Sequence, residues 1–150
     1  MPFIHFSHIG RFRGWAARAY TLEDVDAFVS TMFSDRSVAR AHHAVVLYRL
    51  SNPFAENYWD GGCDGTGATI MYQMQKMHVL DVVVLATRWY GGILLYSDRF
   101  KHFNSVAAGA LRAGPFAEEG EQYKLTEKAA QKEKDKQDKE HWIASKHRKS

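Results

Sequence analysis

The sequence predicts an α/β domain of the α+β kind, a two-layer sandwich in which helices pack on one face of a single sheet. Three observations point to this class. The run Val82-Val83-Val84-Leu85-Ala86 is short, apolar and β-branched, which is typical of a strand buried on both faces. Segments with apolar residues at helical spacing lie on either side of it. Strand-like and helix-like segments follow in the order β-α-β-β-α-β-α, which indicates one sheet with helices packed on it.

The N-terminal part of the chain predicts a strand and then a helix. Residues 1–10 are apolar and histidine-rich without a helical period, so they form either an edge strand or a frayed lead. Residues 12–20 alternate as in a strand. Thr21 and Asp24 have the spacing of a capping box, which predicts that a helix begins here. The expected buried face of this helix consists of Leu22, Val25, Phe28, Val29, Met32 and Phe33.

The middle of the chain predicts a pair of strands and a second helix. Residues 44–50 form an apolar strand, residues 51–53 a turn, and residues 57–60 a second strand that runs into Gly61-Gly62. Thr66 is expected to cap the following helix. The apolar positions of that helix recur on one face and are Ile70, Met71, Met74 and Met77.

The last part of the domain predicts a strand, a glycine turn and a helix without a gap between them. The glycines of the pair Gly91-Gly92 permit positive φ angles after the strand at Val82. Ser97 is expected to cap the helix, and Gly114-Pro115 is expected to end it. From Phe100 onward its apolar positions have helical spacing and are Phe103, Val106, Ala107, Ala110 and Leu111.

Length and composition predict one domain with a tail. The chain has 150 residues, of which 45% are hydrophobic, enough for one core of ordinary size. We expect a domain over residues 11–116 and a charged tail, helical or disordered, over residues 117–150. The formal charge of +3 permits nucleic acid binding without requiring it. A single cysteine and the absence of a leader pattern indicate a cytoplasmic protein, and no apolar run is long enough for a membrane span.

Three stretches of the chain resemble the Impact family, and the resemblance covers roughly residues 11–116. The string Arg-Trp-Tyr-Gly-Gly-Ile-Leu-Leu at residues 88–95, followed by Asp-Arg-Phe-Lys-His, resembles the family signature. Residues 41–49 resemble the family's Ala-Thr-His and the strand after it, with His43 in the place of the motif histidine. The family's Asp-Asp-Gly-Glu falls on residues 60–63, where the first and third positions match. The similarity is greater to the eukaryotic branch of the family.

The resemblance implies a fold and a role. The fold is that of the second domain of ribosomal protein S5, a two-layer fold with a left-handed crossover. Eukaryotic members act in translational control, where they restrain the starvation-activated kinase of translation initiation factor 2 by competing for its ribosome-associated activator. The partner implied here is that activator or another translation-regulatory protein. Those members carry an additional RWD domain, which this chain is expected to lack.

Catalytic and metal-binding hypotheses centre on two histidines. His42 and His43, with Asp60 and Cys63, suggest a metal site or a thiol-imidazole pair. Adjacent residues of a regular strand point to opposite faces, so the two histidines cannot bind one metal from such a strand. The alternative for His43 is a hydrogen-bonded histidine packed under the Gly62 loop. Because the family's acidic pair is missing, we expect no catalytic residue, no metal and no cofactor.

A binding surface is the remaining hypothesis for the signature stretch. Gly91-Gly92 lacks the spacing of a phosphate-binding loop. The mixture of cations and flat rings that surrounds it suits either RNA or a protein partner, unless the rings belong to the core. The expected binding residues are His43, Asp60, Gly62, Arg88, Trp89, Tyr90, Gly91, Gly92, Asp98, Arg99 and Lys101. A non-enzymatic regulatory binding module ranks first, a direct RNA- or ribosome-binding protein second, and a hydrolase-like enzyme for a small substrate third.

Overall fold

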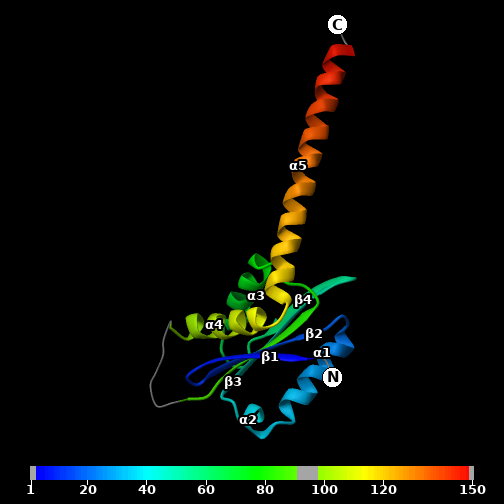
Figure 1. The fold of residues 1–150 in the computed structure, drawn as a ribbon. Coiled ribbons are helices and arrows are strands. Elements are labelled where there is room, and N and C mark those ends of the chain that lie inside the picture. Colours follow the sequence, from blue (N-terminus) through cyan, green and yellow to red (C-terminus); the bar gives the residue numbers. More distant parts are fainter. Residues whose placement is uncertain (1–2, 91–97, 149–150) are drawn as a thin grey trace.

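The computed structural model describes residues 3–90 and 98–148, which form a five-stranded antiparallel sheet and the helices around it (Figure 1). The order across the sheet is β1-β2-β5-β3-β4, with every neighbouring pair antiparallel. This arrangement confirms the α+β class. The strands are β1 (Ile4–Ile9), β2 (Phe12–Arg18), β3 (His43–Ser51), β4 (Phe54–Trp59) and β5 (Val82–Arg88).

Helices cover both faces of the sheet. The expected helical layer consists of α3 (Thr66–Lys76) and α4 (Asp98–Ala113), and α1 (Leu22–Phe33) with the short α2 (Arg36–Ala39) covers the other face. The sequence predicts helices on one face only, and the structure adds this second cover. Every residue of β5 is buried, and alternate residues belong to two separate core clusters. A central strand that is apolar on both sides needs cover on both sides, and α1 and α2 provide it on the second.

The first helix begins as the sequence predicts. The Thr21 side chain accepts a hydrogen bond from the Asp24 amide, and the Asp24 carboxylate accepts one from the Thr21 amide, which completes the capping box. Val25, Phe28 and Met32 are buried. The prediction was wrong for Leu22 and Phe33, which are 55% and 37% exposed. They are the terminal residues of α1, and its central turns are the part that packs on the sheet.

The second helix begins differently from the prediction. Gly65, with φ of 85°, is the N-cap residue, and Thr66 is the first helical residue. The Thr66 hydroxyl donates to the Cys63 sulfur at 3.0 Å, so it does not cap the helix. Asp60 accepts hydrogen bonds from the amides of Gly65 and Gly67 instead. Ile70, Met71 and Met74 are buried as expected, and the partly buried Met77 packs against them.

The other predicted elements keep their places with shifted ends. β4 begins at Phe54 and ends at Trp59, so residue 60 lies outside it. The helix α4 ends before Gly114-Pro115 as expected. The predicted glycine turn and the cap at Ser97 lie outside the described residues. All the apolar positions predicted for α4 are buried: Phe103, Val106, Ala107, Ala110 and Leu111.

The C-terminal segment is one long helix, α5 (Phe116–Arg148), which extends away from the sheet in Figure 1. Its 33 residues correspond to a length of about 50 Å. Phe116 and Gly120 are its buried residues within the described part of the chain, and its distal half is exposed on all sides. No described helix combines the length and apolar character needed to cross a bilayer.

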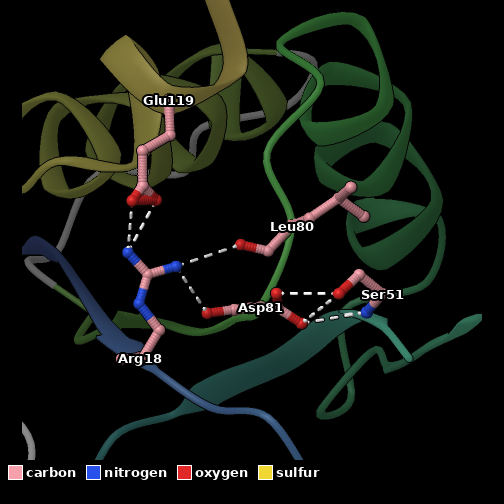
Figure 2. A network of polar contacts seen from close by, with 5 residues as sticks. All are labelled: Arg18, Ser51, Leu80, Asp81 and Glu119. Atoms are coloured by element: carbon pink, nitrogen blue, oxygen red, sulfur yellow. Dashed lines mark hydrogen bonds and ion pairs between the residues drawn. The ribbon is translucent and has the colours of Figure 1, made fainter. Parts of the chain in front are cut away.

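An arginine of β2 holds the first turns of α5 against the domain (Figure 2). One guanidinium nitrogen of Arg18 lies 2.6 Å from each carboxylate oxygen of Glu119, and another donates to the carbonyls of Leu80 and Asp81. The Asp81 carboxylate in turn accepts hydrogen bonds from the amide and hydroxyl of Ser51. The base of α5 is therefore connected through Arg18 to the ends of β3 and β5.

Candidate functional site

A row of three side chains crosses the sheet at one end of β2, β5 and β3. Arg88 pairs with Phe12 on one side and with His43 on the other. Residues opposite one another in an antiparallel ladder point to the same face, and Phe12 belongs to the core cluster under α4. The side chains of Arg88 and His43 therefore lie on the α4 side. Arg88 is 6% exposed, and its guanidinium lies 5.5 Å from the centre of the Phe12 ring.

Tyr90 joins this row to the residue before β3. Its hydroxyl oxygen lies 2.8 Å from Nε2 of His43, and its ring stacks on the His42 ring with the centres 4.2 Å apart. The Tyr90 amide donates to Nδ1 of His42 at 3.0 Å. The guanidinium of Arg88 lies 5.1 Å from the Tyr90 ring. Tyr90 is 52% exposed, so one side of it remains accessible to a partner.

The hydrogen bonds of His43 define its tautomer. Nδ1 lies 3.4 Å from the carbonyl oxygen of Gly61, which can only accept, so Nδ1 carries the proton. Nε2 then accepts from the Tyr90 hydroxyl. Burial lowers the pKa of His43 below 6.5, and the charges of Arg88, His42 and Arg99 lower it further, against an opposing contribution from the Gly61 carbonyl. The imidazole is therefore neutral at pH 7 and lies among cations.

A glycine loop covers His43. Gly61 has φ of 58°, and a Cβ atom there would collide with the carbonyl group of Ala44. A Cβ atom on Gly62 would lie 3.4 Å from Nδ1 of His43, so the loop rests on the imidazole. The sequence left a metal ligand, a thiol-imidazole pair and a hydrogen-bonded histidine under the loop open for His43, and its contacts with Gly61, Gly62 and Tyr90 are those of the last. This loop needs glycine where the family motif has its second aspartate.

The first turn of α4 adds Arg99 to the site. The Nε atom of Arg99 is buried and has no hydrogen-bond partner within the described part of the chain. The guanidinium lies 4.7 Å from the Phe100 ring, and that ring lies 3.6 Å from where a Cβ atom on Gly65 would be. The beginning of α4 therefore packs against the loop that leads into α3. We call His42, His43, Arg88, Tyr90 and Arg99 the Tyr90 cluster.

Four other predicted site residues, Asp60, Trp89, Asp98 and Lys101, make no contact with the cluster that involves a hydrogen bond or a ring within the described part of the chain. Asp60 directs both carboxylate oxygens to the first amides of α3. Trp89 follows the last residue of β5 and points to the face covered by α2, where its indole nitrogen donates to the carbonyl of Ser37 at 3.0 Å. Asp98 and Lys101 are exposed on α4. Gly91 and Gly92 lie outside the described residues.

His42 is the residue of the Tyr90 cluster that was not among the binding residues predicted from the sequence. Alternation along a strand placed it on the face opposite to His43. Because β3 begins at His43, the alternation does not extend to His42, and both rings contact Tyr90. Among residues 3–90 and 98–148, no group of three or more histidine, cysteine or acidic side chains is arranged to hold a metal ion. The cluster offers ring faces, positive charge and one exposed phenol.

Comparison with known proteins identifies the family. The sequence profile described as the Impact N-terminal domain matches residues 9–111. The chain belongs to the Impact family. Impact proteins of known sequence include Protein IMPACT-A of Xenopus tropicalis, 31% identical over 81% of this chain, and the Protein IMPACT homolog of Schizosaccharomyces pombe, 34% identical over 67%. This chain spans 41% and 37% of the length of these two Impact relatives.

Two solved structures resemble this Impact chain. One is described as the two-domain translational regulator Yih1, with 28% identity, a TM-score of 0.52, and coverage of 76% of this chain and 49% of that chain. The other is a hypothetical protein with 24% identity, a TM-score of 0.62, and coverage of 74% of this chain and 57% of that chain. At 24% identity, the second likeness shows the fold alone.

Proposed function

We propose that this protein is a non-enzymatic regulatory binding module of translational control. Its role would be to restrain the starvation-activated kinase of translation initiation factor 2 by occupying the kinase's ribosome-associated activator. Membership of the Impact family supports this proposal, as does the likeness to a structure described as a translational regulator. In this proposal the domain of residues 11–116 supplies the binding surface, and residues 117–150 form its tail.

The Tyr90 cluster is the observation that carries the proposal. An exposed tyrosine stacked on a histidine, with a buried arginine behind it, presents a rigid aromatic anchor beside positive charge. Tyrosine and arginine are enriched at the energetic centres of protein interfaces. Since both rings of the histidine pair hold Tyr90, little side-chain freedom remains to be lost when a partner binds.

The groups that an enzyme would use have structural partners here. The carboxylate of Asp60 stabilises the start of α3. Cys63 is 5% exposed, and its sulfur accepts a hydrogen bond from the Thr66 hydroxyl. These contacts favour a binding function over a hydrolase. We expect Cys63→Ser to retain partner binding, and a large functional loss in a folded Cys63→Ser protein would favour the hydrolase instead.

Affinity purification from starved-cell extract tests the proposal. The tagged full chain is incubated with extract, with and without nuclease, and bound proteins are identified by mass spectrometry. We expect the kinase activator to be recovered after nuclease treatment. Tyr90→Ala should lower its recovery, whereas Tyr72→Ala, which removes a tyrosine that is 62% exposed on α3, should not.

Two other results would contradict the proposal. Recovery of ribosomal proteins alone, lost when nuclease is added, would indicate an RNA-dependent binder, for which the net charge of +3 gives modest support. Equal loss of the activator with Tyr90→Ala and Tyr72→Ala would mean that the Tyr90 cluster is not the docking surface.

A further inference from the structure

Two arginines of the Tyr90 cluster form no ion pair with an acidic side chain among residues 3–90 and 98–148. Within the described part of the chain the ion pairs involve Arg18, Arg49 and His78, and none involves Arg88 or Arg99. Arg88 is 6% exposed, and the buried Nε–H of Arg99 has no acceptor among the residues that the structure describes. Both guanidinium groups lie over rings instead.

A buried arginine without an anion is energetically costly. The guanidinium has lost hydration, and ring faces replace only part of that stabilisation. Asp60, the acid nearest in sequence to the glycine loop, is occupied by the amides of α3. The guanidinium groups of Arg88 and Arg99 both act on His43, and each carries a positive charge. The Tyr90 cluster therefore carries an excess of positive charge on side chains that are partly removed from water.

We propose that Arg88 and Arg99 together bind one carboxylate, carried by an acidic segment of a protein partner. This inference rests on the proposed function and adds the chemistry of the partner. The planar guanidinium matches a carboxylate through two parallel hydrogen bonds, and such charge-assisted pairs are among the strongest polar contacts in proteins. The Nε–H of Arg99, which has no acceptor within the described part of the chain, is one donor for the carboxylate, and the exposed Tyr90 ring forms the edge of the site.

The surroundings favour a single carboxylate over an RNA backbone. Asp98 precedes Arg99 and is exposed, and Asp64 is exposed beside Gly65, at the loop that Phe100 contacts. A nucleic acid carries one negative charge per nucleotide, so neighbouring phosphates would meet these two carboxylates. A single carboxylate brings one negative charge instead of a series of them, so it meets less repulsion from Asp64 and Asp98.

Nuclear magnetic resonance on the full chain tests the site directly. The protein, labelled with ¹⁵N, is titrated with a short peptide of alternating glutamate and glycine, and the Nε–H signal of Arg99 is followed. We expect a saturable shift of this signal. The matched peptide with glutamine in place of glutamate should cause no shift, because it offers no carboxylate.

Variants separate a built site from general attraction. Arg99→Gln should weaken binding of the glutamate peptide about tenfold or more, the loss expected for one charge-assisted pair. Arg112→Gln removes an equal charge from an exposed position in the last turn of the same helix and should change affinity less than about twofold. Arg88→Gln should resemble Arg99→Gln. If Arg88→Gln fails to fold, the Arg99 signal of the wild-type protein and the affinity of Arg99→Gln are sufficient to test the inference.

Three outcomes would overturn the inference. They are an unchanged Arg99 signal, equal weakening by Arg99→Gln and Arg112→Gln, and a stronger Arg99-dependent response to single-stranded oligouridine than to the peptide. The proposed function can fail separately. Peptide binding at Arg99 without recovery of the activator from extract would keep the carboxylate site and reject that partner. If the activator is still recovered with Arg99→Gln and the Arg99 signal does not respond to the peptide, the proposed function stands and the carboxylate site is rejected.

Discussion

Nε2 of His43 lies 2.8 Å from the hydroxyl oxygen of Tyr90, across 47 positions of sequence. The contact joins the first residue of β3 to the segment that follows β5. The same imidazole supports the Gly61 loop through Nδ1. One neutral histidine therefore connects the glycine loop, the sheet and the exposed aromatic ring, and its protonation state should affect all three.

Protonation of His43 should destabilise the fold at mildly acidic pH. The unfolded chain protonates this ring near its ordinary pKa of 6.5, whereas the folded chain does so only at lower pH, mainly because of burial. The contribution of the neutral His43 ring to the free energy of unfolding should therefore be fully present above pH 6.5. It should decrease as the pH falls from 6.5 to the lowered pKa of the folded protein.

Urea unfolding of the wild-type protein and of His43→Asn on both sides of that range checks this prediction. Asparagine does not titrate, so the stability difference between the two proteins should shrink as the pH falls. A constant difference would show that His43 does not contribute to the acid sensitivity. A titration of the His43 ring signals, followed by nuclear magnetic resonance, should give a pKa below 6.5 in the same protein.

Gly61→Ala should be strongly destabilising. Its φ of 58° is left-handed, and the added Cβ would collide with the carbonyl of Ala44. Gly10→Ala is the matched control, because Gly10 has φ of 55° and a Cβ atom there would meet no other atom within 4 Å. We expect a loss of about 1 kcal/mol for Gly10→Ala and about 3 kcal/mol or more for Gly61→Ala in chemical unfolding. Equal losses would mean that the contact with Ala44 relaxes easily.

Glu119→Gln should loosen the base of α5. It replaces the carboxylate that receives Arg18, while the Arg18 guanidinium stays 4.7 Å from the Phe116 ring. Both partners are partly exposed, so the loss in stability should be about 1 kcal/mol or less. Amide hydrogen exchange in the first turns of α5 should rise. Glu118→Gln, the exposed neighbour, should leave exchange unchanged, and an equal rise in both variants would reject a specific role for the pair.

Gly120→Ala should reverse the usual effect of alanine in a helix. Replacing a helical glycine by alanine normally stabilises by about 1 kcal/mol. At Gly120 the Cβ would collide with the carbonyl oxygen of Met77, so α5 would have to move away from the end of α3. We expect a lower melting temperature, with Glu121→Ala on the exposed side as control. A higher melting temperature for Gly120→Ala would show that α5 is not tightly docked there.

Much of the local structure was predictable from neighbouring residues. The capping box of Thr21 and Asp24, the buried β5 and the apolar face of α4 depend on hydrogen bonds and periodicities within a few positions. The start of α3 was not predictable in this way. Its cap depends on Asp60, whose carboxylate reaches across the turn to the Gly65 and Gly67 amides and leaves the Thr66 hydroxyl to bond Cys63.

The candidate site was predictable only in part. His43, Gly62, Arg88, Tyr90 and Arg99 were named from the sequence, and the structure brings them together. Trp89, equally prominent in the same stretch, points to the other face, where its indole nitrogen donates to the Ser37 carbonyl of α2. The position of His42 against Tyr90 depends on where β3 begins, which no local pattern showed.

The sequence by itself determined the family, the α+β class and most of the helices and strands, because these depend on residue order and short-range periodicity. The tertiary structure decided which side chains meet. Pairing of β5 between β2 and β3 sets Arg88 between Phe12 and His43, and the packing of α1 on the second face closes the core. These relationships join residues far apart in the chain, so they follow from strand register and packing, which the order of residues does not display.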